Sequence, residues 1–310
     1  MERSAHVDTF ARDNLPPFEQ WPELLLEGNP DVAYPARLNC AVELVDAHVN
    51  QDRGDRVALR WRDGDQKKTM TYKELMVLTN QIAQVLTDDM KLVPGNRVLL
   101  RGPNNPMMAA SWLAVTSGTT GKPKGCMHFH RDVLAMCDTF SRHILRTHAD
   151  DIITGTPPLA FTFGLGGMLC FPLREGGSTV LIEKLTPEEL LRTVDEFGVT
   201  MTFTAPTFYR QMAPLASRFG LSTLKKTVSA GEALPDATRQ LWKEATDIEM
   251  IDGIGGTEMI HVFVSSPPDE VRRGAIGKVV PGYIAQVVDD DFNPLPVGEV
   301  GRLAIKGPTG

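Results

Sequence analysis

The spacing of hydrophobic residues alternates between two periods along the chain, and this alternation predicts strands and helices in turn. Short apolar or alternating runs, which are typical of strands, lie at 56–61, near Thr69, and at 96–101, 126–130, 151–155, 178–182, 199–204, 227–230 and 248–251. Apolar residues three and four positions apart, which are typical of helices, lie at 40–50, 71–85, 107–115, 131–146, 186–197, 206–217 and 235–245. This order favours an α/β fold with mostly parallel sheets flanked by helices.

Three of the predicted helices begin with a local signal. Thr71–Glu74 and Thr186–Glu189 each have the threonine and glutamate of a capping box, in which each side chain accepts from the backbone N–H of the other residue. Asn105 stands before Pro106, and proline is favoured at the first position of a helix. These signals predict where the helices start.

The pattern changes near Ala275. Apolar runs at 284–288 and 300–306, separated by a turn-rich stretch, predict antiparallel strands. We therefore expect α/β subdomains over residues 1–274 and the start of a small antiparallel, β-barrel-like region over residues 275–310.

Composition narrows the class of protein. The 310 residues are 42% hydrophobic, so the chain has enough apolar side chains for a sizeable core. The net charge of −7 argues against a nucleic-acid partner or an anionic membrane surface. Apolar runs are too short to span a membrane, and the N-terminus has no apolar segment typical of a secretory signal. The four cysteines show no C-x-x-C spacing, so we expect reduced thiols and a cytoplasmic protein.

The stretch Thr116–Gly125, TSGTTGKPKG, has the composition of a phosphate-binding loop. It combines glycines, hydroxyl side chains and two lysines and contains no hydrophobic side chain. Backbone N–H groups, hydroxyls and cations together favour an anion such as the phosphates of a nucleotide. The loop is not a Walker A motif, because its glycines are too close and Pro123 replaces the magnesium-binding hydroxyl. The alternative is a flexible linker.

Four further stretches support a specific resemblance. They are Ser229–Pro235, Asp252–Glu258, Val280–Tyr283 and Gly301–Pro308. Together with TSGTTGKPKG, and in this order, they resemble the motifs of the adenylate-forming superfamily, which includes acyl-CoA synthetases, luciferases and peptide-synthetase adenylation domains. The resemblance covers nearly the whole chain. Without it, Ser229–Pro235 alone is equally typical of an ordinary strand–turn–helix.

The resemblance implies a role for each motif. Thr257 would contact the α-phosphate of ATP, Glu258 would hold Mg²⁺, and Lys124 would join them as a catalytic residue. The residues implied to bind the ATP phosphates are Thr116, Ser117, Gly118, Thr119, Thr120, Gly121, Lys122 and Lys124. The residues implied to bind adenine are Gly231, Glu232, Ala233, Asp252 and Gly253.

One departure from the superfamily pattern points to a subgroup. Ile254 stands where the superfamily has a tyrosine that stacks on adenine, and Thr257–His261 reads TEMIH. Both features are similar to benzoate-CoA and 2-aminobenzoate-CoA ligases. The resemblance implies an aryl pocket formed by Thr162, Phe163, Gly164, Ile254, Gly255 and His261. The alternative for His261 is a strand histidine whose ring bonds the backbone.

The expected function is ATP-dependent activation of an aromatic carboxylate to acyl-AMP and then to the CoA thioester. ATP, Mg²⁺ and coenzyme A are the implied cofactors and co-substrates, and the acid is of the benzoate or 2-aminobenzoate type. We expect no nucleic-acid or membrane partner, and a homodimer stays open. His128 and His130 lack a nearby third ligand, so we interpret them as surface or packing residues of one strand rather than a metal site.

The chain also lacks parts that the resemblance leads one to expect. The stretch that normally separates the helix at 107–115 from the loop is missing, so we expect an internal shortening before Thr116. The ribose-binding motif, the hinge and the C-terminal lid domain would follow Gly310, so we expect a truncated chain. The alternatives are therefore a catalytically impaired fragment or pseudoenzyme that at most binds nucleotide, and a fatty-acyl-CoA ligase.

Overall fold

The computed structural model describes residues 6–115 and 126–310. Its larger sheet is built from β1 (Val57–Asp63), β2 (Gln66–Thr71), β3 (Ile152–Gly155), β4 (Ser178–Leu181), β5 (Met201–Thr204), β6 (Lys226–Ser229), β7 (Met250–Gly255), β8 (Val262–Ser265) and β9 (Lys278–Val279). In the described residues these strands have the order β2-β1-β4-β3-β5-β6-β7-β8-β9. The pairs from β1 to β7 are parallel, and β2, β8 and β9 join antiparallel at the two edges. The predicted mostly parallel sheet is confirmed.

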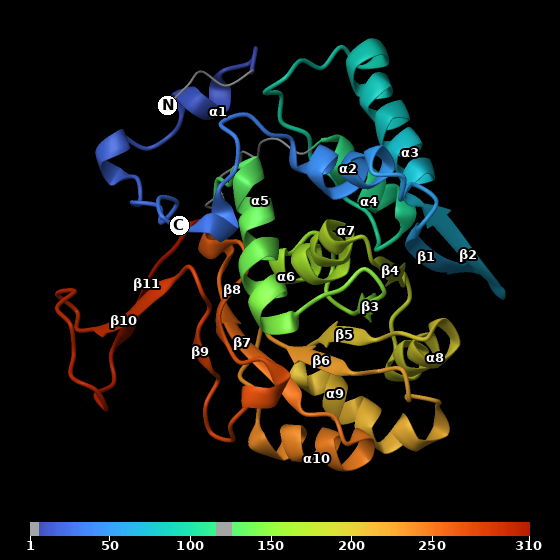
Figure 1. Cartoon of the computed structure of the whole chain (residues 1–310), viewed down its shortest axis with the longest axis vertical. Helices are drawn as coiled ribbons and strands as arrows, with labels where there is room; N and C mark the ends of the chain where they lie inside the picture. Colours follow the sequence, from blue (N-terminus) through green and yellow to red (C-terminus); the bar gives the residue numbers. More distant parts are fainter. Residues whose placement is uncertain (1–5, 116–125) are drawn as a thin grey trace.

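The α-helices cover both faces of this sheet (Figure 1). They are α2 (Ala47–Asn50), α3 (Tyr72–Gln84), α4 (Pro106–Ala114), α5 (His130–Met136), α6 (Thr162–Leu165), α7 (Phe171–Glu175), α8 (Pro187–Phe197), α9 (Pro206–Met212) and α10 (Asp236–Thr246), whereas α1 (Phe10–Asp13) lies in the N-terminal arm, away from the sheet. Neighbouring residues of a strand point to opposite faces. Met250 accordingly packs with Trp242 in the cluster under α8, α9 and α10, whereas Ile251 packs with Phe171 on the other face. None of these helices is long and apolar enough to cross a membrane.

Two of the local helix signals act as predicted. Thr71 and Glu74 form the reciprocal capping box of α3, with Thr71 N to Glu74 Oε2 at 2.7 Å and Glu74 N to Thr71 Oγ1 at 3.2 Å. Asn105 caps α4 by accepting from Met108 N at 2.9 Å. These bonds lie within four residues of one another, so the sequence suffices to predict them.

The capping box at Thr186 is only half formed. Thr186 Oγ1 accepts from Glu189 N at 3.1 Å. The Glu189 carboxylate, however, pairs with Arg62 at 3.2 Å and with Arg192 at 3.3 Å instead of returning to the Thr186 backbone. The full-box prediction is wrong because Arg62, on β1, competes for the carboxylate.

Two predicted strands do not form. Residues 96–101 are irregular, and Leu99 is 92% exposed. Asp8 of the N-terminal arm bonds Asn96 at 2.7 Å, and no strand of the described chain pairs with this segment. Residues 126–129 are also irregular, because the Asp132 side chain accepts from Phe129 N at 2.9 Å and starts α5 at His130. The backbone N–H and C=O groups of a strand need hydrogen-bond partners on a neighbouring strand. The spacing of apolar side chains does not show whether such a strand is present.

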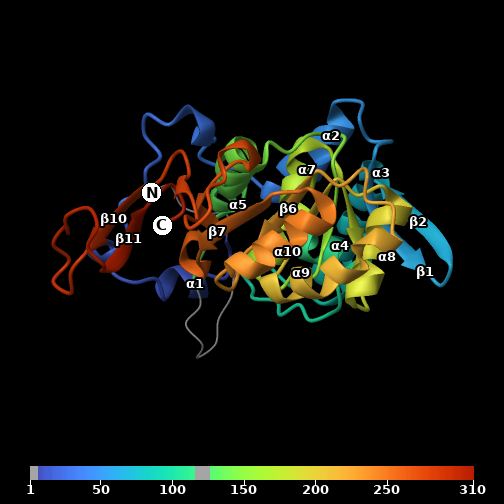
Figure 2. The same cartoon turned by 90° about the horizontal axis from the view of Figure 1, so that it is seen from below.

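The C-terminal residues form a separate hairpin. Strands β10 (Ile284–Val288) and β11 (Arg302–Lys306) pair antiparallel, from Ile284 opposite Lys306 to Val288 opposite Arg302. The N-terminal arm packs against its end, with Leu25 N donating to Gly307 O at 2.9 Å. Figures 1 and 2 both show this hairpin standing apart from the larger sheet. The small antiparallel region is confirmed, and its treatment as a domain starting at residue 275 stays a prediction.

Candidate functional site

The carboxyl ends of the parallel strands meet at one edge of the sheet, where ligands of open α/β folds bind. Strand β6 ends at Ser229, which lies beside Asp252 of β7. Two candidate motifs, 230–235 and 256–261, lie in the segments that follow these strands. The predicted phosphate loop, Thr116–Gly125 with Lys122 and Lys124, lies outside the described residues.

The residues predicted to bind adenine fall into two environments. Gly231, Glu232 and Ala233 form an exposed turn, and Gly231 has φ +87°, a left-handed conformation with open space around it. Asp252 is buried instead, and its carboxylate accepts from Gly253 N at 2.9 Å. Burial raises the pKa of Asp252. Only the exposed turn therefore offers its backbone directly to a ligand, while Asp252 supports the neighbouring strand end.

Thr257 and Glu258 lie on a tight turn that follows β7. Both residues are exposed, whereas Met259 and Ile260 are buried beneath them. Ile260 has φ +61°, which is sterically disfavoured for a β-branched residue. The described residues provide no ion pair for Glu258, whose carboxylate is thus available to a ligand. A single carboxylate fits Mg²⁺, which keeps several waters and binds substrate phosphates in addition to one or two protein carboxylates.

His261 is enclosed by aromatic rings just before β8. Its ring centroid lies 4.7 Å from that of Phe171, 5.2 Å from that of Phe140 and 5.8 Å from that of Phe163. His261 is 3% exposed, and neither ring nitrogen has a hydrogen-bond partner in the described part of the chain. Buried polar groups almost always have a hydrogen-bond partner, so the two unpaired nitrogens of His261 are an exception that marks a candidate functional residue. The alternative, a strand histidine whose ring bonds the backbone, is not observed, because His261 precedes β8 and its ring nitrogens have no partner among the residues that the structure describes.

Glycine 166 makes the close packing around His261 achievable. A Cβ at Gly166 would lie 2.5 Å from His261 Cδ2 and 2.9 Å from Phe171 Cζ. Gly255, another predicted pocket residue, likewise lies against the His261 carbonyl, 2.7 Å from the position of a Cβ. The backbone therefore reaches the histidine from two sides where no side chain fits.

The structure brings some of the predicted pocket residues together around His261. Phe163, on α6, and Gly255 contact it, and Ile254 packs against the same core cluster. Gly164 lies against the backbone of Pro158, so it shapes α6 without contacting His261. Thr162 is the first residue of α6. Sequence reasoning missed Phe140 and Phe171, because buried phenylalanines in apolar helical runs are indistinguishable from core residues.

Burial governs the protonation of His261. It lowers the pKa of His261 from 6.5 to about 3, while the Phe163 backbone opposes the shift without reaching hydrogen-bond geometry. His261 therefore binds a proton below pH 6.5 in the unfolded chain, but only below about pH 3 in the folded chain. Stability from this group is complete above pH 6.5 and is lost as the pH falls towards 3.

A pH-dependent unfolding experiment tests this assignment. Between pH 7.5 and pH 5 the single group should cost about 2 kcal/mol of unfolding free energy. We expect the wild-type loss over this interval, measured by denaturant unfolding, to exceed that of His261→Leu by this amount. Equal losses in the two proteins would contradict a neutral, buried His261.

His128 and His130 bond separate parts of the chain. His128 Nε2 lies 2.7 Å from Thr257 O, and His130 Nδ1 accepts from Cys40 N at 3.0 Å. The prediction that both histidines lie on one strand is wrong, because residues 126–129 are irregular and His130 begins α5. No group of three or more metal-binding side chains occurs in the described ranges.

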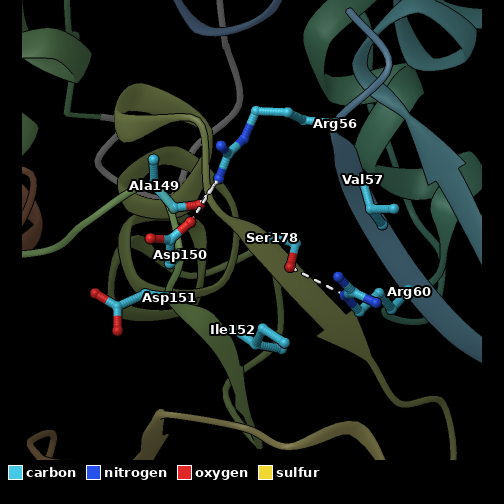
Figure 3. A pocket seen from close by; sticks show the side chains of 8 residues that line it. All are labelled: Arg56, Val57, Arg60, Ala149, Asp150, Asp151, Ile152 and Ser178. Atoms are coloured by element: carbon cyan, nitrogen blue, oxygen red, sulfur yellow. Dashed lines mark hydrogen bonds and ion pairs between the residues drawn. The ribbon is translucent and has the colours of Figure 1, made fainter. Parts of the chain in front are cut away.

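A cavity of about 220 Å³ lies away from these motifs, at the amino ends of β1, β3 and β4 (Figure 3). Arg56 donates there to the carbonyls of Ala149 and Gly176 and pairs with Asp150. Arg60 Nε donates to Ser178 Oγ at 3.0 Å. The arginines thus join β1 to the starts of the neighbouring strands. Because ligands of this fold class bind at the opposite, carboxyl edge, we assign the cavity a structural role.

Comparison with known proteins gives a consistent result. The AMP-binding enzyme family matches residues 45–116 and 115–310. Benzoate-CoA ligase of Thauera aromatica is 34% identical over 222 residues, 70% of this chain and 42% of that protein. Anthranilate-CoA ligase of Pseudomonas aeruginosa is 35% identical over 202 residues, 64% of this chain and 39% of that protein. The chain thus spans about two fifths of these relatives.

Solved structures agree with the fold. The anthranilate CoA ligase AuaEII in complex with anthranoyl-AMP superposes with a TM-score of 0.83 at 25% identity, covering 91% of this chain and 72% of that one. A benzoate CoA ligase from Burkholderia xenovorans superposes with a TM-score of 0.77 at 23% identity, covering 88% and 72%. The two family segments meet where the sequence predicts an internal shortening, and that shortening stays a prediction. The chain belongs to the AMP-binding enzyme family.

Proposed function

We propose that this chain carries the acid-activating part of an ATP-dependent aryl-CoA ligase. A carboxylate oxygen of an aromatic acid attacks the α-phosphorus of ATP, and the bond from that phosphorus to pyrophosphate breaks. The sulfur of CoA then bonds the acyl carbon, the bond to AMP breaks, and the thiol proton leaves to solvent. Benzoate and 2-aminobenzoate are the proposed acids. The named activities of the benzoate-CoA and anthranilate-CoA ligase relatives support this proposal.

The observation that carries the proposal is the neutral, unpaired imidazole of His261 inside an aromatic enclosure. The ring of Phe163, which is partly exposed beside His261, suits a flat apolar ligand better than a flexible alkyl chain. An unpaired His261 nitrogen suits a polar substituent on such a ligand, because a hydrogen bond from the ligand would remove the cost of leaving that nitrogen unpaired. The 2-amino group of 2-aminobenzoate can donate a hydrogen bond, and one nitrogen of a neutral imidazole can accept it.

The exposed turn after β7 supplies the proposed phosphate chemistry. The Thr257 hydroxyl donates to an α-phosphate oxygen, and Glu258 holds Mg²⁺. When bound, Mg²⁺ neutralises negative charge on the phosphates and on the departing pyrophosphate. Gly231, Glu232 and Ala233 present exposed backbone to the adenine. Lys122 and Lys124 of the phosphate loop are proposed to supply positive charge that binds the phosphates.

The test is acid-dependent exchange of radiolabelled pyrophosphate into ATP by the purified chain. We expect exchange with benzoate and with 2-aminobenzoate, and less with octanoate. Exchange that prefers octanoate would assign the chain to fatty-acyl-CoA ligases. A folded chain that binds ATP, measured by calorimetry, and gives no exchange with any acid would reduce the proposal to nucleotide binding.

A further inference from the structure

His128 connects the segment after the phosphate loop to the Thr257–Glu258 turn. Its Nε2 lies 2.7 Å from Thr257 O, and its Nδ1 lies 3.2 Å from Asp132 Oδ2. A carbonyl oxygen and a carboxylate oxygen both accept hydrogen bonds, so the ring donates from both nitrogens. Burial alone would lower the pKa of His128, but the bonds to Asp132 and Thr257 outweigh it and raise the pKa.

Asp132 fixes the orientation of this ring. It is 2% exposed and lies in the first turn of α5, and its Oδ2 also accepts from Phe129 N at 2.9 Å. Arg131 Nε lies 3.5 Å from its other oxygen. The imidazole is therefore held by a buried carboxylate at the start of a helix rather than by a mobile surface group.

The turn that His128 contacts has a conformation that its own residues disfavour. Ile260 has φ +61°, and such positions persist only where the surrounding structure imposes them. Within the turn, Thr257 O accepts from Ile260 N at 3.0 Å. From outside, His128 bonds the same carbonyl, and Thr309 Oγ1 donates to Met259 O at 3.0 Å. Two side chains from distant parts of the chain thus bond two backbone carbonyls of the turn.

We propose that His128, oriented by Asp132, is a positioning residue that holds the Thr257–Glu258 turn in the geometry needed for acid activation. The role rests on the proposed function, because it assigns His128 to the same reaction. His128 contacts the Thr257 carbonyl at 2.7 Å, so we assign it a role that acts through the turn. Loss of this bond should lower the rate of the chemical step and leave the aromatic enclosure around His261 unchanged.

The first experiment measures the turn without any activity. We expect backbone amides of the segment 256–261 to exchange hydrogen faster in His128→Phe than in the wild type of the ligand-free full chain. His128→Gln should restore slow exchange, because the Gln amide still offers an N–H to the Thr257 carbonyl. His143→Phe is the control, because His143 pairs with Asp31 at 2.8 Å away from the turn. Unchanged exchange in His128→Phe would overturn the proposal.

The second experiment measures kinetics of pyrophosphate exchange. We expect His128→Phe to lower kcat roughly 10- to 100-fold, as displaced catalytic groups do, with the KM for benzoate unchanged within about twofold. His128→Gln should recover most of kcat. A KM that rises in proportion, or a Gln variant as slow as the Phe variant, would overturn the positioning role. Absence of exchange in the wild type would count against the proposed function alone, because the hydrogen-exchange result stands without it.

Discussion

Replacement of Glu258 by glutamine is expected to lower acid-dependent pyrophosphate exchange by about 100- to 1000-fold, the usual effect of removing one preorganised electrostatic group. The amide keeps the size of the side chain and removes the charge that would hold Mg²⁺. Glu258 is exposed and has no ion pair among the described residues, so the unfolding free energy should change by less than about 0.5 kcal/mol. Steady-state exchange at saturating Mg²⁺, with denaturant unfolding alongside, measures both quantities.

Glu299→Gln provides the matched control, because Glu299 is also exposed and lies in the loop between β10 and β11. Its exchange rate should equal that of the wild type. If Glu258→Gln retained wild-type exchange while folding normally, the metal-binding role proposed for Glu258 would be wrong. A loss of exchange accompanied by a large loss of stability would instead show that Glu258 supports the turn.

Replacement of His261 by leucine is expected to separate stability from acid binding. The variant removes two buried, unpaired nitrogens, so at pH 7.5 the ligand-free chain should gain about 1–3 kcal/mol of unfolding free energy. It should also lose the preference for 2-aminobenzoate over benzoate, because leucine offers no acceptor to the amino group. Denaturant unfolding and calorimetric titration with the two acids measure these effects.

His48 provides the matched control for this experiment. It is also 3% exposed, but its ring nitrogens lie 2.7 Å from Leu173 O and 2.9 Å from Arg53 Nη2. His48→Leu should therefore lose about 1–3 kcal/mol, because the Leu173 carbonyl is left unpaired. Equal destabilisation of the two variants would mean that the His261 nitrogens have partners in solution.

Patterns within short stretches of sequence predicted much of the fold. The parallel strands and their helices follow from the spacing of apolar residues, and the strand at 284–288 has the bounds predicted for it. Thr71 and Asn105 cap their helices as predicted, because each partner is three residues away. The motifs at Asp252–Glu258 and Thr257–His261, in contrast, are identified through their resemblance to the adenylate-forming superfamily. Residues close in sequence are close in space, so their hydrogen bonds and shared faces can be read from order alone.

The tertiary structure alone decided which distant groups meet. Arg62 pairs with the carboxylate of Glu189 in place of the capping box, and residues 96–101 pair with no strand within 6–115 and 126–310. Phe140 and Phe171 enclose His261 although nothing near them in sequence marks them as site residues. His128, just before α5, contacts the carbonyl of Thr257, just after β7, although 129 positions separate the two residues in the chain. These contacts depend on packing among segments far apart in the chain, which the local period of side chains does not encode.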